Sequence, residues 1–539
     1  MKLEIWVAEP AQKRRRQQDV PKSACGTPAR RSGERWHAHK ARGLKQGRAA
    51  RPVEKVRGSK VAERAEEAKF GEGESLADGS VVAMKRGNAR GAKGPYRRHS
   101  SIKVRQGGMT KPTIELQELR ARIGQRAKSA PTHKFWGLYV HIVKRTTLEA
   151  AYLDAKRNRG APGSDGETFE RIDEAGREEF LAVLAAELGS GSYKPRAYRR
   201  REIPKGGGRV RTISIPTIRD RVVQGAIRLV LEPIFEADFS ESSYGARPGR
   251  SAHQAIGLVR QGLLRRKHRV VDIDLSRFFD CIRHDRILEK VARRVQDDEV
   301  LALIKQFLKN GGKRGLPQGS PLSPLLANLA LNDLDHALDR GRGFITYVRY
   351  LDDMVVLAPD SERGRRWADR ALERIREEAE AIGVSLNTDK TRTVSIADVK
   401  EKFVFLGFEF RWKRSPRTGR WYADTVPRPE RVTQVLRQIR NTLRASRHLP
   451  MQEAVRRVNQ ITRGWVMYFR VGNSGDALAK VKYHAERKVR RFASRKSKRG
   501  GFGWKRWSSE VVYGAWGLNS DYQVRYLDLA KVGPNPKEA

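Results

Sequence analysis

The sequence is poor in cysteine, contains no long hydrophobic run and has a shortage of acidic residues. Cys25 and Cys281 are its only cysteines, which excludes a disulfide framework and a multi-cysteine zinc module. Such cysteine usage is typical of a reducing compartment. We find no run of about 18 apolar residues, no signal-type segment and no lipidation motif, which argues against a membrane protein. The chain is therefore predicted to be cytoplasmic.

The shortage of acidic residues leaves a strongly basic chain. Lys and Arg number 111 against 62 Asp and Glu, for a net charge of +49 and a pI near 10.8. This balance indicates a polyanionic partner, of which nucleic acid is the commonest, with an anionic membrane as the competing alternative. The length of 539 residues favours more than one domain.

The first part of the chain differs from the rest. Residues 1–108 are rich in Lys, Arg, Gly, Ala and Ser and lack sustained apolar periodicity. Such composition predicts an extension that is disordered or that folds on RNA. An alternative is that translation starts at Met109 and that the preceding segment is an over-extended reading frame.

A globular domain is expected from Thr113 onward, where apolar residues recur with helical spacing. Helices and strands then mix without strict alternation, which predicts the α+β class. Residues beyond about 426 are predicted to be helical and basic. The predicted strands and hairpins are a hairpin at 199–217, a strand at 269–279, a hairpin at 344–358 and a strand at 403–412.

Acidic residues gather on two of these predicted strands. Asp352 and Asp353 are adjacent at the turn of the 344–358 hairpin, and Asp272 and Asp274 share one face of the 269–279 strand. If the strands are neighbours, the carboxylates converge, and such like charges repel unless a proton or a cation lies between them. Mg²⁺ prefers hard oxygen ligands of this kind. The competing interpretation is that Asp352 and Asp353 are ordinary turn residues.

Several segments with characteristic sequences follow one another along the chain. In order they are "REIPKGGGRVRTISIPTIRDRVVQGAI", "SYGARPGRSAHQAI", "VVDIDLSRFFDCIRHDRIL", "GLPQGSPLSPLLANLALNDLD", "YVRYLDDMVVL", "GVSLNTDKTRTV", "FVFLGFEF" and, further on, "VNQITRGWVMYFR". Their sequence and order resemble those of group II intron-encoded reverse transcriptases and maturases. The resemblance covers residues 109–539, without a C-terminal His-Asn-His endonuclease.

The resemblance implies a right-hand polymerase fold, with an antiparallel palm sheet followed by an α-helical thumb or maturase domain. It also implies an RNA-directed DNA polymerase that binds its group II intron RNA, promotes splicing and copies the RNA into cDNA during retrohoming. The implied partners are a DNA target or primer and dNTPs, and the implied cofactor is Mg²⁺. The implied location is the bacterial cytoplasm, near the nucleoid. A homodimer is left open. The expected domains are 109–195 for the helical extension and start of the fingers, 196–412 for fingers and palm, 426–485 for the thumb, and 486–539 for a basic DNA-binding tail.

The same resemblance assigns roles to individual residues. The matching catalytic and metal-binding triad is Asp274, Asp352 and Asp353. The matching dNTP-binding residues are Lys205, Arg211, Phe279, Gln318 and Lys390. Taken without the family, Phe279 is an ordinary packed aromatic on a strand, Gln318 a loop glutamine, and the basic pair of the first hairpin a solvated surface.

Two residues depart from the family pattern or are not assigned by it. Leu351 stands where the family usually has Ala, at a position that the resemblance places beside the primer end. This departure puts the strength of the polymerase activity in doubt. The alternative function is therefore an RNA-binding splicing factor with a weak or inactive polymerase site. Asp272 matches no family ligand and is expected to be satisfied by solvent or a salt bridge.

The aromatic residues near the end of the chain divide into two groups. Trp465, Tyr468 and Phe469 are interpreted as core rather than base-stacking residues. Trp504, Trp507 and Trp516, interleaved with Lys and Arg, suit phosphate neutralisation with some stacking. A general RNA chaperone would explain the charge but not the ordered segments, and "VNQITRGWVMYFR" argues against a reverse transcriptase without an intron.

Overall fold

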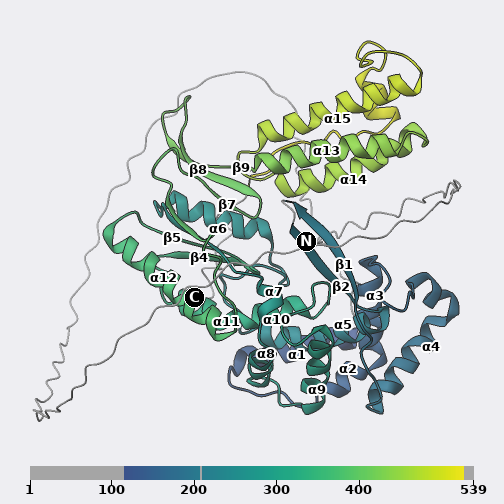
Figure 1. The fold of residues 1–539 in the computed structure, drawn as a ribbon, viewed down its shortest axis with the longest axis vertical. Helices are drawn as coiled ribbons and strands as arrows, with labels where there is room; N and C mark the ends of the chain where they lie inside the picture. Colours follow the sequence, from purple (N-terminus) through teal and green to yellow (C-terminus); the bar gives the residue numbers. More distant parts are fainter. Residues whose placement is uncertain (1–113, 207–208, 527–539) are drawn as a thin grey trace, which may run out of the picture. The chain divides into compact units, whose positions relative to one another are not determined.

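The computed structural model describes residues 114–206 and 209–526 (Figure 1). All of them belong to one of the two units into which the chain divides. The expectations for residues 1–108, including the position of the start codon, lie outside the described residues. No helix within the described ranges has the length and apolar character needed to cross a membrane.

The first described elements are helices and one hairpin. The long helix α5 is buried nearly all round, which makes it the centre on which α1 and α3 pack. The predicted hairpin at 199–217 is confirmed, because β1 and β2 pair antiparallel. The bounds are Ile114–Ser129 for α1, Leu138–Val143 for α2, Arg145–Arg157 for α3, Phe169–Gly189 for α4, Arg199–Gly206 for β1, Arg209–Ile215 for β2 and Ile218–Glu236 for α5.

A four-stranded antiparallel sheet, in the order β4-β5-β3-β6, carries the acidic residues. Because strand side chains alternate, Val271 and Ile273 enter the larger core while Val270 enters a second core on the opposite face. The expected antiparallel palm sheet is thus confirmed. The strands are β3 (Arg269–Asp274), β4 (Thr346–Tyr350), β5 (Asp353–Ala358) and β6 (Arg392–Ser395).

The strand predicted at 269–279 is too long. β3 ends at Asp274, and Phe278–Cys281 form the short helix α7. Arg277 has a positive φ of 43°, which breaks the extended conformation, and Phe278 then turns into the core with 2% of its surface exposed. Phe279 therefore lies on a helix and not on a strand.

Helices cover both faces of this sheet. Helix α12 packs on β3 and β5, while α6 packs on β4 and β5 and contributes to the second core. The helix α6 begins with a capping box, in which Ser251 and Gln254 exchange side-chain and backbone hydrogen bonds. The bounds are Ala252–Leu264 for α6, His284–Ala292 for α8, Asp298–Gly311 for α9, Ser323–Ala330 for α10, Asn332–Asp339 for α11 and Glu362–Ala381 for α12.

The single strand predicted at 403–412 is wrong, because the chain reverses within it. Strands β7 (Phe403–Phe405) and β8 (Phe408–Arg414) are joined by Leu406 and Gly407, whose φ angles of 49° and 80° allow a tight two-residue turn. The strand β9 (Trp421–Pro427) completes a three-stranded sheet.

The helical region after residue 426 is confirmed. Helices α13 (Pro429–Ala445), α14 (Met451–Phe469) and α15 (Gly475–Lys496) lie side by side (Figure 1) and share a third core. The helix α15 runs without interruption across the expected boundary between residues 485 and 486. A short π-helix, η1 (Glu510–Ala515), follows.

The aromatic residues at the end of α14 behave as expected of core residues. Phe469 is 6% exposed and packs on Phe408, with ring centroids 5.0 Å apart. Trp465 and Tyr468 are partly buried against the same cluster. The interpretation of these residues as core is therefore confirmed.

Candidate active site

Two of the predicted catalytic carboxylates are brought together by strand register. Asp274 is the last residue of β3, and it is paired with Asp353, the first residue of β5. Asp352 precedes Asp353 in the turn that connects β4 and β5. The antiparallel pairing of β3 with β5, which are far apart in the sequence, therefore places the acidic residues at one end of the sheet.

The acidic residues interact strongly. Burial, followed by the neighbouring carboxylates of Asp352, Asp274 and Asp272, raises the pKa of Asp353 to about 7, against the opposing effect of Lys390. The ammonium group of Lys390 lies 2.8 Å from Oδ2 of Asp274. Among the residues that the structure describes, Lys390 is thus the cationic side chain that pairs with Asp274.

Asp272 has a different partner. Its Oδ2 lies 3.5 Å from Nε of Arg392 on the neighbouring strand β6. Burial is the main cause that raises the pKa of Asp272, and Arg392 opposes it. The expectation that Asp272 is satisfied by a salt bridge is confirmed.

The chemistry of the acidic end fits a divalent cation. Carboxylate oxygens are the hard ligands that Mg²⁺ prefers, and a bound cation would offset the burial and the like charges that raise the pKa of Asp353. In the described part of the chain, no three His, Cys, Asp or Glu side chains are already gathered at metal-binding distance. Asp274 forms a salt bridge with Lys390. If a cation binds at this end of the sheet, Asp274, Asp352 and Asp353 are the residues that would hold it.

A buried polar network holds the turn between β4 and β5 in place. The guanidinium of Arg349 forms an ion pair with Asp335 in which neither side chain is exposed. The same guanidinium donates to Oδ1 of Asn328, 2.9 Å away, and to the carbonyl oxygen of Leu351, 3.1 Å away. Tyr347 donates to Oδ1 of Asp335, 2.9 Å away. Helices α10 and α11 thereby hold the strand that leads into the turn.

A glycine lies directly against this turn. A Cβ atom at Gly245 would approach the backbone nitrogen of Leu351 to 2.5 Å and its Cγ to 2.8 Å. Leu351 itself has a φ of 56°, which L-residues seldom adopt. The carbonyl oxygen of Gly245 accepts from Asn328 at 2.8 Å, which ties the glycine into the buried network. Gly245 and Leu351 thus fix the path of the turn together.

Two predicted dNTP-binding residues, Arg211 and Gln318, contact each other. Arg211 on β2 donates from Nε to the side-chain oxygen of Gln318, and the carbonyl oxygen of Gln318 accepts from the backbone of Ser214, 2.8 Å away. The Gln318 amide also reaches Asp280 on α7, at 3.5 Å. The loop that carries Gln318 is therefore attached to the hairpin.

The remaining predicted residues are placed separately. Phe279 on α7 is half-buried and packs edge-on against Phe278, with centroids 5.3 Å apart. Its carbonyl oxygen accepts from the backbone of Leu316, 2.6 Å away, so α7 and the Gln318 loop are joined. Lys390 lies with the acidic group, as described above. The predicted role of the Lys205 side chain lies outside what the structure describes.

Sequence comparisons identify two domains in this chain. Residues 203–410 match the reverse transcriptase (RNA-dependent DNA polymerase) family, and residues 432–510 match the group II intron maturase-specific domain. Protein YkfC of Escherichia coli strain K12 is 31% identical over 363 residues, which span 58% of this chain and 92% of YkfC. The chain belongs to the group II intron reverse transcriptase and maturase family. Its reverse transcriptase domain places it among the RNA-directed DNA polymerases.

Other relatives are matched over shorter lengths. The group II intron-encoded protein LtrA of Lactococcus lactis subsp. cremoris is 31% identical over 42% of this chain, but the match spans only 38% of LtrA. A solved structure of telomerase from Candida albicans with a telomeric RNA fragment aligns over 64% of this chain and 68% of its own, with 14% identity and a TM-score of 0.33.

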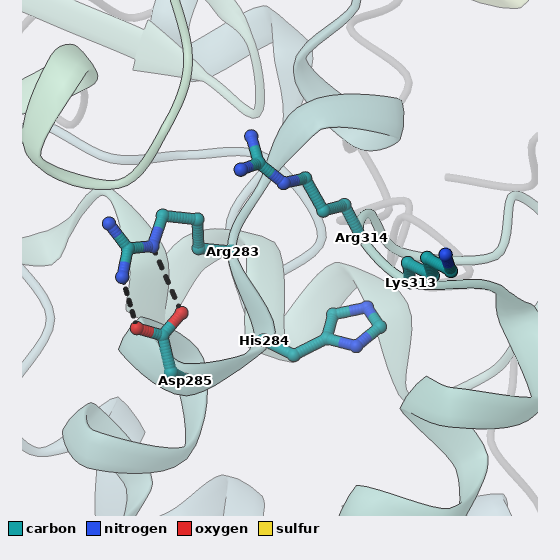
Figure 2. A pocket seen from close by; sticks show the side chains of 5 residues that line it. All are labelled: Arg283, His284, Asp285, Lys313 and Arg314. Carbon is teal, nitrogen blue, oxygen red and sulfur yellow. Dashed lines mark hydrogen bonds and ion pairs between the residues drawn. The ribbon is translucent and has the colours of Figure 1, made fainter.

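A basic cavity lies beside the end of α7 and the loop that leads to Gln318. It measures about 390 Å³ and is lined by Arg283, His284, Asp285, Lys313 and Arg314 (Figure 2). Asp285 is neutralised by Arg283, which holds the pKa of Asp285 down near 2. The loop of Lys313 and Arg314 is fixed where the backbone of Gly315 donates to the carbonyl oxygen of Ile282, 2.8 Å away. The cavity therefore presents a net positive lining.

Sequence reasoning missed the supporting residues of the site. Arg349, Asp335 and Asn328 were not singled out, and neither was Gly245. A signal existed for Arg349, since it is a charged residue on an otherwise apolar strand and points to the same face as the core residue Tyr347. Gly245 gave no local signal.

Proposed function

We propose that this reverse transcriptase copies RNA into DNA at Asp274, Asp352 and Asp353. The observation that carries the proposal is the register pair of Asp274 with Asp353, and the pKa of Asp353, raised to about 7 by burial and by the neighbouring carboxylates, is consistent with it. Mg²⁺ is the proposed cofactor, and when bound it would activate a primer hydroxyl and neutralise charge on the leaving group.

The protein's own residues bind and orient the other reactants. Arg211 offers a guanidinium fork that suits a triphosphate. Gln318, which accepts a hydrogen bond from Arg211, is proposed to line the same nucleotide site. Phe279 is proposed to lie under the sugar of the incoming dNTP, and Lys205 to complete the phosphate contacts. Lys390 is proposed to leave Asp274 and pair with phosphate when a cation binds.

The helical region is proposed to bind the group II intron RNA and to promote its splicing, while the reaction itself belongs to the RNA. The match to the maturase-specific domain and the basic faces of α13 and α15 support this role. A basic segment after residue 485 is proposed to bind the DNA target or primer during retrohoming. We place the complex in the cytoplasm near the nucleoid, and light scattering would distinguish a monomer from a homodimer.

The test is extension of a DNA primer on an RNA template by the purified protein, with and without Mg²⁺. Asp352→Asn is compared with Asp369→Asn, an exposed aspartate on α12. We expect extension by the parent and by Asp369→Asn, and none by Asp352→Asn, with RNA binding unchanged in all three. Extension by Asp352→Asn equal to that of the parent would contradict the proposal.

A second function is favoured by one observation. The Leu351 side chain fills the space beside Gly245, since its Cγ lies 2.8 Å from where a Cβ of Gly245 would be, at the place where the family usually has Ala. Under this alternative the chain is an RNA-binding splicing factor with a weak polymerase site. It predicts that a folded parent that binds RNA extends primers poorly and that Leu351→Ala increases extension. Equal extension by the two proteins would exclude this alternative.

A further inference from the structure

A second cavity lies in the helical region, away from the acidic residues. It measures about 390 Å³ and lies between one face of α14 and the segment that follows η1. Its lining has no acidic side chain. The residues that line it are Gln452, Arg456, Asn459, Gln460, Arg463, Trp516 and Gly517.

The wall opposite α14 is firmly held. The side chain of Asn459 donates to the carbonyl oxygen of Gly517 at 2.7 Å and accepts from the backbone of Asn519 at 2.8 Å. Leu518, between these contacts, is 3% exposed and anchors the segment in the third core. The wall is therefore formed before any ligand arrives, which lowers the entropy cost of binding.

The indole of Trp516 is a part of this wall. It is half-buried and touches Trp507, with ring centroids 5.1 Å apart and planes inclined at 55°. It follows directly on η1, and short π-helical turns occur often at functional sites. An aromatic ring held at the edge of a polar cavity can stack against a flat ligand.

The opposite wall supplies polar and cationic groups. Gln452, Gln460 and Arg463 are exposed on one face of α14, and Arg463 forms no ion pair with any residue in the described ranges. Arg456 is paired with Glu453, whose carboxylate lies outside the cavity lining. A primary amide offers both a donor and an acceptor, as the edge of a nucleobase does.

We propose that this cavity binds one unpaired nucleotide of a single-stranded nucleic acid. The base stacks on Trp516, its edge is read by Gln452 and Gln460, and the adjoining phosphate pairs with Arg463. The inference rests on the proposed function only in that the helical region handles nucleic acid, because the polymerase site contributes nothing to it. The site would let the helical region hold a base flipped out of a strand.

The experiment is a binding titration of the full chain, without Mg²⁺ or dNTPs, so that a failure of polymerase activity does not affect it. The probes are fluorescein-labelled single strands of about 12 nucleotides, one set of RNA and one of DNA, each also prepared with abasic positions. The variants are Trp516→Leu, Trp516→Tyr and Arg463→Gln. The control is Trp421→Leu, an exposed tryptophan of β9 stacked on Trp412.

We expect Trp516→Leu to weaken binding by about 5- to 150-fold, and Trp516→Tyr and Trp421→Leu to bind like the parent. The abasic probe should bind the parent weakly, and Trp516→Leu should weaken it little further, because the base and the indole act as a pair. Arg463→Gln should lower the slope of log affinity against log salt by about 0.7, whereas Trp516→Leu leaves that slope unchanged.

Other results would overturn the proposal. These are an equal loss in Trp421→Leu, additive losses for Trp516→Leu and the abasic probe, or parent-like affinity in Trp516→Leu. Thermal unfolding shows whether Trp516→Leu folds. If it does not, Gln460→Ala replaces it in the comparison of parent and variant on the normal and abasic probes, since Gln460 is exposed on the helix. A preference for the RNA or the DNA set identifies which strand supplies the nucleotide.

Discussion

The guanidinium of Arg349 and the carboxylate of Asp335 form an ion pair that is completely buried, with Nε of Arg349 2.7 Å from Oδ1 of Asp335. Arg349 lies on β4, next to the last residue before the turn that carries Asp352, and Asp335 lies on α11. The turn therefore depends on a charged contact inside the core. Burying two charges is favourable only when the hydrogen bonds around them are satisfied.

Removal of Arg349 should destabilise the fold strongly. Arg349→Met leaves Asp335 buried without a counter-charge, so we expect the free energy of unfolding to fall by about 3–5 kcal/mol in urea denaturation. The double change Arg349→Met with Asp335→Leu should recover most of that loss. In the control Arg366→Met, which breaks an exposed pair with Glu362, the loss should stay below about 1 kcal/mol. A double variant as unstable as the single one would contradict this account.

Gly245→Ala should impair catalysis more than folding. The new methyl group would meet the backbone of Leu351 and displace the turn that carries Asp352. A shift of about 1 Å at a catalytic group can lower a rate about 100-fold, and we expect a loss of that order in primer extension with RNA binding retained. The control is Gly343→Ala, where no atom lies within 4 Å of the new methyl group. Parent-like extension by Gly245→Ala would show that the turn has room to relax.

Lys390→Met should strengthen Mg²⁺ binding in the absence of dNTP. Lys390 competes for Asp274 at 2.8 Å, and its charge repels a second cation. Because the Lys390 side chain is 47% exposed, the gain should be modest, about 1 kcal/mol or roughly fivefold in Kd by calorimetry. Weaker binding of Mg²⁺ would instead mean that Lys390 orders the carboxylates. Lys400→Met, an exposed lysine beyond β6, is the control.

Arg211→Gln should raise the KM for dNTPs. Loss of the fork on β2 removes hydrogen bonds to a charged triphosphate, each worth about 1.5–3 kcal/mol, so we expect KM to rise at least tenfold in steady-state primer extension. The affinity for primer and template should not change. Arg201→Gln, on the other strand of the hairpin, is the matched control. If the two variants raise KM equally, the hairpin acts only through its general charge.

The acidic end of the palm sheet was predictable because strand alternation and the order of motifs are local properties of the sequence. The alternation of Asp272 and Asp274 with apolar residues placed both on one face, and only the neighbour relation with β5 remained to be assumed. That relation holds, with Asp274 opposite Asp353. The fold class followed in the same way from the mixed pattern of helices and strands.

Features that depend on residues far apart in the chain were not predictable. Gly245 meets Leu351 only after folding, and nothing near Gly245 in sequence indicates it. The turn at Gly407 was missed because one glycine inside an apolar, aromatic run looks like a strand residue. Positive φ angles at both Leu406 and Gly407 are what reverse the chain there. The end of β3 was missed for a similar reason, since Arg277 shows no turn signal.

The second core joins elements that family comparisons treat as separate. Phe408 of β8 packs on Phe469 of α14, and Tyr468 donates to the carbonyl oxygen of Leu406, 2.9 Å away. A chimaera joined near residue 430 would set one parent's Phe408 against another parent's Phe469. Viable recombinants should therefore take β7, β8 and β9 from the same parent as α14. The segment that must be exchanged as one unit is thus longer than the helical region alone.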